Sequence, residues 1–556
     1  MKKILFILFC LSLSTLYSQS EKKYDVNSSD LPEWVNLMYA NKVDEGKVIK
    51  AYELYYEKNE FVKNKHTQYY KRWLRNLSRE TIQPKNYKST SSNNWECIGP
   101  WDFDKDAESR SYAPGAAHLY TIEQSISNSN VLYAGAATAG AWRSNNKGNN
   151  WEHITKDLHL SGVYAIEIDF QDENIIYISG NGGIYKSIDG GSNWTSIGGS
   201  NFNSQSHSTK DIKMHPQNNQ IIFVATNKGL YKSTDGGLNL NEIMSGEFQE
   251  IEFHPLSSDT MYFIRHDANY TEFYRSDDNG NSLNLFSNGW PSPSANDEQK
   301  RTEIAVSIAS PNKIVALATG AANGGSGLYG IYISYDKGEN WTFRCCGPQP
   351  AGVPSANNIN MMGWQPSGLD DGGQYYYDLA LAVNPFNANI IHVGGVNHWI
   401  SFDDGFTFSC PAKWSEPHKK GYVHADIHDI NYFGNDLWFA CDGGIFYSDN
   451  YGDSIYKKMY GIEGTDFWGF GAGFKDGDVM LGGTYHNGTL LKDNNTYLTD
   501  WICTDGGDNV RGFVNFGNPR IAYSDYGGKI LSGDRNIAIT NFPIDKKPNA
   551  SYIIGQ

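Results

Sequence analysis

Histidines and aspartates alternate in one short segment of the chain, which reads His424-x-Asp426-x-His428. On a β-strand alternate residues share a face, so these three side chains would project together. Two imidazoles and a carboxylate can bind a divalent metal ion. However, residues two apart on a strand have Cα atoms roughly 6.6–7 Å apart, which makes convergence on one ion difficult. The segment therefore favours a hydrogen-bonded polar cluster lining a central channel, with a metal site as the alternative.

Two aspartates of the same region could form a catalytic pair. Asp426 and Asp442 are expected in or beside strands, outside the repeated turn motif described below. Glycosidases use two carboxylates across a cleft, about 6.5–9.5 Å apart if they invert the substrate. Asp378 and Asp508 are further candidates for this role. Because acidic residues are common at strand ends, structural turn acids are the preferred interpretation of all four.

Aromatic and imidazole side chains near these acids could instead bind a ligand. The segments Tyr375-Tyr376-Tyr377 and Asn397-His398-Trp399 are expected on an exposed central face. We therefore predict binding of an extracellular glycan or protein, with glycoside hydrolysis and an adhesive or structural role in a larger exported protein as alternatives. No cofactor is specified, although a divalent cation such as calcium is compatible with these side chains. The predicted ligand-binding residues are His424, His428, Tyr377, Asp378, His398, Trp399, His486 and Asp508.

A repeated phrase, Ser-x-Asp-x-Gly-x-x-Trp, specifies the elements that must position these residues. Its best copies are residues 187–194 and 334–341, and successive copies begin 43 to 67 residues apart. One four-stranded propeller blade takes about 40–45 residues, so the longer spacings imply insertions. Runs such as 174–180 and 221–226 have the composition of strands. The sequence thus predicts an all-β chain, a β-propeller of about 7–10 four-stranded blades. Further copies begin at Ser144, Ser233, Ser276, Ser401 and Ser448, with degenerate candidates around Lys492 to Trp501 and from Ser532.

The residue types of the repeat favour a folding device. The aspartate can accept hydrogen bonds from the N–H groups of its own loop, the glycine permits positive φ, and the tryptophan covers the turn. We therefore predict structural roles, not ligand sites, for Asp189, Trp194, Asp235, Asp278, Asp336, Trp341 and Asp403.

This repeat resembles the Asp-box, or bacterial neuraminidase repeat, and its arrangement is similar to the sortilin and xyloglucanase type of propeller in exported bacterial proteins. The resemblance covers about residues 94–534 and implies a secreted or cell-surface propeller. It does not imply a sialidase, because the chain has no Arg-Ile-Pro motif and few arginines in the blades. Residues 421–429, 441–445 and 482–489 are similar to a subset of this group for which no general activity carries over.

The chain divides into three predicted parts. Lys2 and Lys3 precede a short apolar run, which predicts a secretory signal peptide over residues 1–19. No later stretch approaches the roughly 20 apolar residues of a membrane span. Residues 20–93 have helical spacing of aromatic residues and are expected to pack on the propeller, which occupies residues 94–556. Because the sequence after Asp534 reads as the opening of another strand, we expect either a truncated chain or ring closure with the Trp95 strand.

Charge and cysteine content limit the partners. The 46 Lys and Arg against 62 Asp and Glu give a net charge of -16, which argues against nucleic acid or an anionic membrane. The six cysteines beyond the signal peptide permit disulfides in an exported protein. Cys345 and Cys346 are adjacent, so they either pair with different partners or form a vicinal bridge.

Overall fold

The computed structural model describes most of the chain as two compact units, residues 1–96 and 97–556. The boundary lies close to the predicted start of the propeller at residue 94. The predicted signal peptide over residues 1–19, the Ser532 repeat, Trp95 and the last strand-like segment lie outside the described residues. Those described are 31–40, 42–62, 64–71, 73, 97–102, 112–158, 160, 162–180, 183–199, 202, 207–294, 296–474, 476–493, 501–531 and 540–542.

The first unit is helical, as the spacing of its aromatic residues indicated. It contains α2 (Glu33–Met38) and α3 (Glu45–Tyr56), and residues 65–71 are also helical. Asp44 caps α3 by accepting a hydrogen bond from the Lys47 N–H. The core of this unit is built from Trp34, Val35, Met38, Val48 and Tyr70. Its predicted packing on the propeller stays a prediction. Among the described helices, none combines the length and apolarity needed to cross a membrane.

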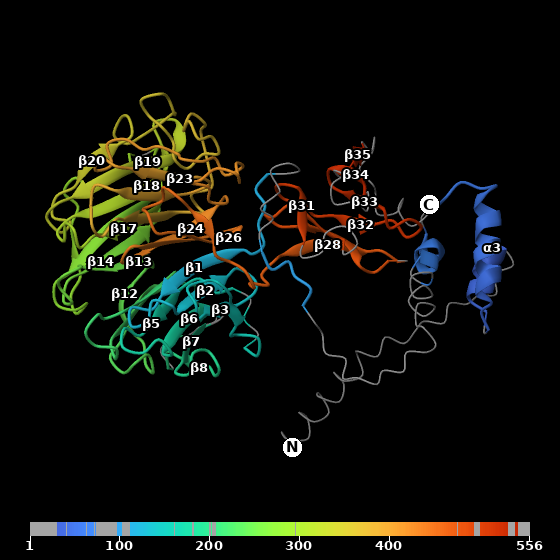
Figure 1. Cartoon of the computed structure of the whole chain (residues 1–556), viewed down its shortest axis with the longest axis horizontal. Coiled ribbons are helices and arrows are strands. Elements are labelled where there is room, and N and C mark those ends of the chain that lie inside the picture. The colour runs from blue at the N-terminus through green and yellow to red at the C-terminus, as the bar shows by residue number, and fades with distance from the viewer. Residues whose placement is uncertain are drawn as a thin grey trace, which may run out of the picture. The chain divides into compact units, whose positions relative to one another are not determined.

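The second unit is built almost entirely of antiparallel sheets, each formed by strands in chain order (Figure 1). Four sheets come first along the chain: β1 (Leu119–Gln124), β2 (Leu132–Ala136), β3 (Ala141–Ser144) and β4 (Glu152–His153); β5 (Ile166–Ile168), β6 (Ile176–Gly180), β7 (Gly183–Ser187) and β8 (Thr195–Ile197); β9 (Thr209–Met214), β10 (Ile222–Thr226), β11 (Gly229–Ser233) and β12 (Asn241–Ser245); β13 (Glu247–Phe253), β14 (Met261–Asp267), β15 (Tyr270–Ser276) and β16 (Asn284–Leu285).

Five more sheets follow, of which the sixth in chain order has three described strands. They are β17 (Glu298–Val306), β18 (Ile314–Ala322), β19 (Gly325–Ser334) and β20 (Thr342–Cys345); β21 (Ala380–Val383), β22 (Ile391–Gly394) and β23 (His398–Ser401); β24 (Ile427–Phe433), β25 (Asp436–Cys441), β26 (Gly444–Ser448) and β27 (Tyr456–Lys457); β28 (Phe467–Ala472), β29 (Val479–Thr484), β30 (Thr489–Asp493) and β31 (Ile502–Asp505); β32 (Gly512–Val514), β33 (Ile521–Ser524), β34 (Gly527–Ile530) and β35 (Thr540–Phe542). The all-β prediction is confirmed by these sheets.

The first strands of the first seven sheets contact one another in a cycle. The order is β1, β5, β9, β13, β17, β21 and β24, and β24 contacts β1. At that last contact the Asp429 carboxylate accepts hydrogen bonds from Thr121 Oγ1 and from the Ile122 N–H, both at 3.0 Å. The inner strands of the sheets are deeply buried: every residue of the second strands β2, β10 and β25 and of the third strands β23, β26 and β30 is buried. Apolar packing between neighbouring sheets thus holds the first strands around a common centre.

The Ser-x-Asp hairpins, which are the repeats beginning at Ser187, Ser233, Ser276, Ser334 and Ser401, share one hydrogen-bond pattern. In the first, Ser187 Oγ donates to Asp189 Oδ1 at 2.9 Å, and Asp189 Oδ1 accepts from the Asn193 N–H at 2.8 Å. The Gly191 N–H donates to Ser187 Oγ at 2.9 Å. Each aspartate therefore bonds to its own loop, as the sequence predicted. In the copies at Ser144 and Ser448, Asn146 and Asn450 take the aspartate's place.

Removing one such carboxylate is expected to weaken its hairpin. Asp336 accepts hydrogen bonds from Ser334 Oγ, from the Asn340 N–H and from Asn340 Nδ2. Asp336→Ala should lower the free energy of unfolding by about 1–2 kcal/mol, because these donors lose their protein acceptor at a partly solvated site. Thermal unfolding measures the change, with Asp259→Ala, an exposed aspartate outside the hairpins, as the control. Equal melting temperatures for the two variants would contradict the prediction.

Of the two alternatives for the adjacent cysteines, the structure has the vicinal bridge. Cys345 and Cys346 form a disulfide at the end of β20. Cys97, Cys410 and Cys441 carry free thiols, which is not what an exported protein predicts. The Cys503 thiol donates a hydrogen bond to the Asp505 carbonyl at 3.3 Å.

Candidate functional site

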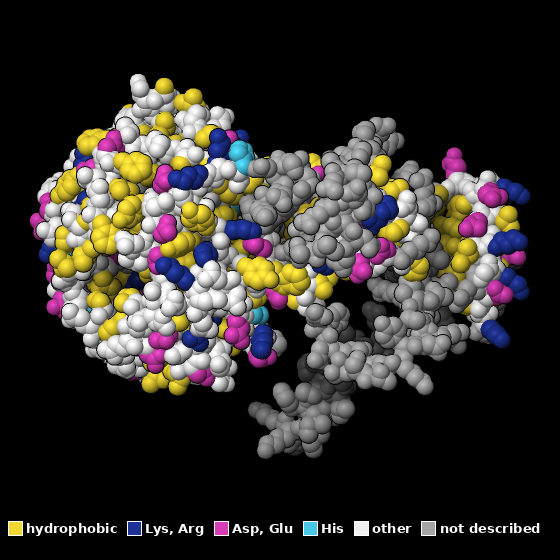
Figure 2. All heavy atoms as spheres, in the orientation of Figure 1, with side chains coloured by type: hydrophobic (Ala, Val, Ile, Leu, Met, Phe, Trp, Pro, Cys, Tyr) yellow, Lys and Arg dark blue, Asp and Glu magenta, His cyan; other side chains and the backbone are white. Residues whose placement is uncertain are grey.

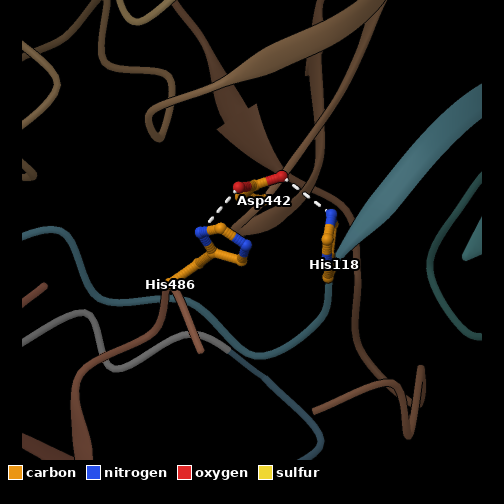
Figure 3. A group of neighbouring side chains, drawn as sticks. All are labelled: His118, Asp442 and His486. Carbon is orange, nitrogen blue, oxygen red and sulfur yellow. Dashed lines mark ion pairs between the residues drawn. The ribbon is translucent and has the colours of Figure 1, made fainter. Parts of the chain in front are cut away.

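A fully buried carboxylate, Asp442, lies at the centre of a polar cluster. It occupies the tight turn between β25 and β26 and is 0% exposed. Its Oδ1 lies 3.0 Å from His118 Nε2 and 2.7 Å from His428 Nε2, and its Oδ2 lies 2.8 Å from His486 Nδ1. The Tyr377 hydroxyl donates to the same carboxylate at 3.2 Å. Figure 3 shows His118 and His486 approaching its two oxygens from opposite ends.

Four separate segments supply these side chains. His118 immediately precedes β1, Tyr377 precedes β21, His428 is the second residue of β24, and His486 lies in the turn between β29 and β30. Two hydrogen bonds hold the turn between β29 and β30. The His486 N–H donates to Asp508 Oδ1 at 2.9 Å, and Asn487 Nδ2 donates to the Asp442 carbonyl at 3.0 Å. The β28–β31 sheet is thereby bonded to the same centre as the sheets that contain β1 and β24.

Gly443, the residue after Asp442, allows the turn between β25 and β26 to pack closely. A Cβ atom at Gly443 would lie 2.2 Å from the His424 ring, well inside van der Waals contact. His424 itself faces away from the carboxylate, with Nε2 3.0 Å from the Ala113 carbonyl and Nδ1 3.2 Å from the Ala425 carbonyl. The ring of His424 therefore shapes the turn without bonding to Asp442.

The histidines keep Asp442 ionised despite its burial. Burial raises the pKa of a carboxyl, but the charge of His428 and hydrogen bonds from His118, His428 and His486 hold the pKa of Asp442 well below its usual value. Burial also opposes protonation of His118, yet its interactions with Asp442 and Asp466 raise its pKa to about 9. The centre is thus an ionised carboxylate paired with protonated His118, whereas burial lowers the pKa of His428.

The carboxyl of Asp426 favours its protonated form, whereas that of Asp442 favours the ionised form. Burial first, then the charges of Asp378 and Asp442, raise the pKa of Asp426 well above its usual value. It accepts a hydrogen bond from Gln374 Nε2 at 2.9 Å and lies within hydrogen-bonding reach of Asp442. Two carboxyls in such contact are closer than the separation considered for an inverting pair. Burial likewise raises the pKa of Asp378, and no described side chain donates to its carboxyl.

The His424-x-Asp426-x-His428 motif does not form one face of a strand. β24 begins only at Ile427, and Asp426 has a positive φ of 61°. Because the chain turns before the strand starts, the three side chains diverge: only His428 bonds directly to Asp442 through its ring. The expected polar cluster exists, but it is completed by Tyr377, His486 and His118, and the last of these was not among the predicted site residues. His118 has no flanking motif in the sequence that could have identified it.

Two predicted ligand-binding residues belong to the core. Trp399 is 2% exposed and packs among apolar residues of the sixth sheet. His398 is 2% exposed, and its Nε2 lies 3.0 Å from His392 Nδ1. The prediction that they present an exposed face is therefore wrong: an apolar β-strand of this length is buried on both faces once neighbouring sheets pack on it.

A polar cavity of about 600 Å³ adjoins the cluster and is lined by Tyr377 and His428. Its other walls are the first strands, which project charged groups into it. Lys213 and Arg301 are accompanied by a larger number of acids. The lining acids are Glu123, Asp211, Glu247, Glu250, Glu252, Glu303 and Asp429.

Aromatic side chains lie beside the cluster and in the lining of the cavity. Tyr120 and Tyr164 line the cavity and stack with ring centroids 5.0 Å apart. Tyr376, also in the lining, is 72% exposed. Trp468, 59% exposed, stacks on Tyr485 at 4.7 Å, and Tyr485 contacts His486. We call Tyr120, Tyr164, Tyr376, Trp468 and Tyr485 the aromatic rim.

Comparison with known proteins identifies the fold. The profile of the family described as sortilin, neurotensin receptor 3, matches residues 139–246. The GH74 xyloglucanase from Xanthomonas campestris superposes with a TM-score of 0.55 at 14% identity, covering 79% of this chain and 69% of the enzyme. The fold is that of a sortilin-like β-propeller. An ancestral GH74 enzyme gives a TM-score of 0.55 at 13% identity, with 79% of this chain and 63% of the enzyme covered.

These likenesses concern the fold of the sortilin-like propeller and not its activity. The chain spans less than two thirds of the ancestral enzyme. No curated protein matches it.

On the face drawn in Figure 2, Lys and Arg side chains are scattered among acidic and apolar ones.

Proposed function

We propose that this protein is an exported propeller that binds a glycan on its central face, between the aromatic rim and the acid-lined cavity. In this proposal the first seven sheets are the blades of a closed ring, and their first strands line the channel. The observation that carries it is the pairing of exposed aromatic rings, above all Tyr376 and Trp468, with a polar cavity of about 600 Å³. Ligand sites combine aromatic walls with a few placed polar groups. A sugar can bind to both features, because its C–H face stacks on aromatic rings and its hydroxyls donate hydrogen bonds to carboxylates.

The charge of the cavity favours a neutral glycan. Seven acids line it against five basic side chains, namely Lys210, Lys213, Lys300, Arg301 and His266, but burial raises the pKa of Glu123 and Glu250 well above the usual value, so the charges in the cavity are close to balanced. The chain as a whole carries a net charge of -16. An anionic sugar, such as a sialylated or uronic one, would approach against this potential. Neutral β-glucans and xyloglucan are therefore the first ligands to test.

Loss of one rim aromatic is expected to weaken retention on a neutral polysaccharide by about fivefold or more. Removing a ring on which a nucleic-acid base stacks costs about 1–3 kcal/mol, and we expect a stacked sugar face to lose a similar amount. Affinity electrophoresis of the full mature chain in xyloglucan and β-glucan gels would measure this for Tyr376→Ala and Trp468→Ala. Phe386→Ala is the matched control, since Phe386 is 59% exposed and does not line the cavity. Equal losses for all three variants would contradict the proposal, and retention on sialylated glycans alone would contradict the choice of ligand.

Glycoside hydrolysis is the second candidate. It is favoured by the opposite pKa displacements of Asp426 and Asp442, the pattern by which acid and base roles are divided between two carboxyls. An inverting pair needs carboxyls about 6.5–9.5 Å apart. Because Asp426 and Asp442 interact directly, hydrolysis of that type would need a further carboxylate such as Asp508. The same gels, scored for new reducing ends, separate the two functions. Cleavage lost in Asp426→Asn favours the enzyme, retention without cleavage favours the binder, and neither favours an adhesive module.

A further inference from the structure

We propose that His118, Asp442 and His486 bind one divalent transition-metal ion beside the central cavity. This inference does not depend on glycan binding. Its basis is the convergence of two imidazoles and a carboxylate from three segments, of which the one with His118 lies more than 300 residues before the other two. One ligand atom from each residue lies within 4.8 Å of the others.

The separations between these atoms suit a metal ion. Zinc lies about 2.0–2.2 Å from histidine nitrogens and carboxylate oxygens, so two ligands of a tetrahedral site are about 3.3–3.5 Å apart. His118 Nε2 and His486 Nδ1 lie 3.0 and 2.8 Å from the two oxygens of Asp442. Outward movements of a few tenths of an ångström would therefore admit the ion in place of the bridging protons. Figure 3 shows the two rings directed at opposite oxygens of the carboxylate.

Neighbouring groups orient the ligands from outside. The second ring nitrogen of His118, Nδ1, faces Asp466 Oδ2 at 3.4 Å. This contact is an electrostatic one without hydrogen-bond geometry. A carboxylate beside the remote nitrogen favours the tautomer that leaves the other nitrogen free to coordinate, and such carboxylates are found around metal-ligating histidines. His428 Nε2 donates to Asp442 Oδ1 at 2.7 Å and so holds the carboxylate plane. The His486 turn is fixed by Asp508 and by Asn487.

The donor set identifies the class of ion. Imidazole nitrogens with one carboxylate suit zinc and other first-row transition metals. Calcium prefers six to eight oxygen ligands, so these donors do not favour the calcium considered from the sequence. The Tyr377 hydroxyl, 2.9 Å from His118 Nε2 and 3.2 Å from both Asp442 oxygens, lies where it could contact the ion or a water bound to it. Tyr377 also lines the cavity, so it lies between the proposed site and the ligand space.

Metal content of the purified mature chain tests this proposal. After dialysis against a chelator and reloading with Zn²⁺, mass spectrometry of the elements should find one equivalent per chain. His486→Ala should weaken Zn²⁺ binding by more than ~100-fold, because replacing even an outer-shell partner costs 10–100-fold. His486 is the variant of choice because it is the least buried ligand, 10% exposed. His418→Ala, which removes an exposed histidine elsewhere, is the matched control.

Substoichiometric Zn²⁺ in the wild type, or full binding by His486→Ala, would overturn the metal site. Near-ultraviolet circular dichroism shows whether His486→Ala folds. If it does not, the proposal is tested instead on the wild type loaded with Co²⁺. Visible absorption of nitrogen-ligated Co²⁺ supports the site, and its absence at saturating Co²⁺ overturns it. None of these measurements uses a glycan, so failure here is distinguishable from failure of the proposed function.

Discussion

Replacing Lys213 by methionine is expected to lower the free energy of unfolding by about 1–3 kcal/mol, between the values for an exposed and a fully buried ion pair, because Lys213 and its acidic neighbours line a cavity and are partly buried. Lys213 projects from β9 into the central cavity, where its pKa is raised well above the usual value. Burial opposes this rise, and the charges of Asp211, Glu252, Glu123 and Glu167 cause it. Methionine keeps the volume but leaves those carboxyls without their cation. Removing one partner from a buried charge network is costly because the remaining charges stay desolvated.

The same variant should change the pH dependence of stability. Burial is the main cause that raises the pKa of Glu167 to about 8 and that of Glu252 to about 7, while Lys213 lowers both. A carboxyl with a raised pKa binds more protons in the folded state, so its contribution is fully present below its unfolded pKa of about 4.5 and is lost as pH rises towards 7–8. Glu250 and Glu303 from the next strands and Asp429 from β24 also face this space. Without Lys213 these pKa values rise further and the loss becomes steeper.

Melting temperatures between pH 5 and pH 8 measure this effect. The wild type should become less stable over that range, and Lys213→Met should lose more than the wild type does. Lys228→Met is the matched control because Lys228 is exposed, lies in the turn between β10 and β11 and does not line the cavity. Equal shifts for the two variants, or a smaller loss with pH in Lys213→Met, would contradict the prediction.

The repeat made the architecture predictable because its information is local. Within the hairpin at Ser334, the bonds to Asp336 and from Gly338 join residues at most four apart, so residue types and spacing are sufficient to infer them. The 40-residue period then indicates four-stranded sheets. The sixth sheet departs from this, since only β21, β22 and β23 are described in it.

The site was only partly predictable because its contacts are distant in the chain. Asp442, His428 and His486 were selected as chemical side chains near expected strands, and the structure brings them together. His118 lies more than 300 residues from Asp442, and nothing in its neighbourhood distinguishes it from a turn residue. The charged cavity was missed for another reason. Glu167 alternates with Ile166 and Ile168, a pattern that also describes a solvent-exposed strand face.

Replacing Asp442 by alanine is expected to cost about 3–5 kcal/mol of folding free energy, measured with a chelator present so that no metal contributes. The carboxylate is 0% exposed and accepts from His118, His428, His486 and Tyr377. Alanine leaves these donors buried without an acceptor, and it removes the charge that stabilises protonated His118. Asp442→Asn, which keeps the shape but not the charge, should lose less.

A double-mutant cycle separates the pair from its surroundings. If Asp442 stabilises the fold through its imidazole partners, Asp442→Asn and His486→Gln should be strongly non-additive, since residues in one hydrogen-bonded network couple by about 0.5–3 kcal/mol. His153→Gln provides the comparison cycle, because His153 bonds to Thr155 in the first sheet and has no contact with Asp442. Additive losses in both cycles would mean that the loss of folding free energy in Asp442→Asn comes from the burial of this side chain alone and not from its bond to His486. Coupling confined to His486 would mean that the β29–β30 turn is held to the centre of the propeller through this carboxylate.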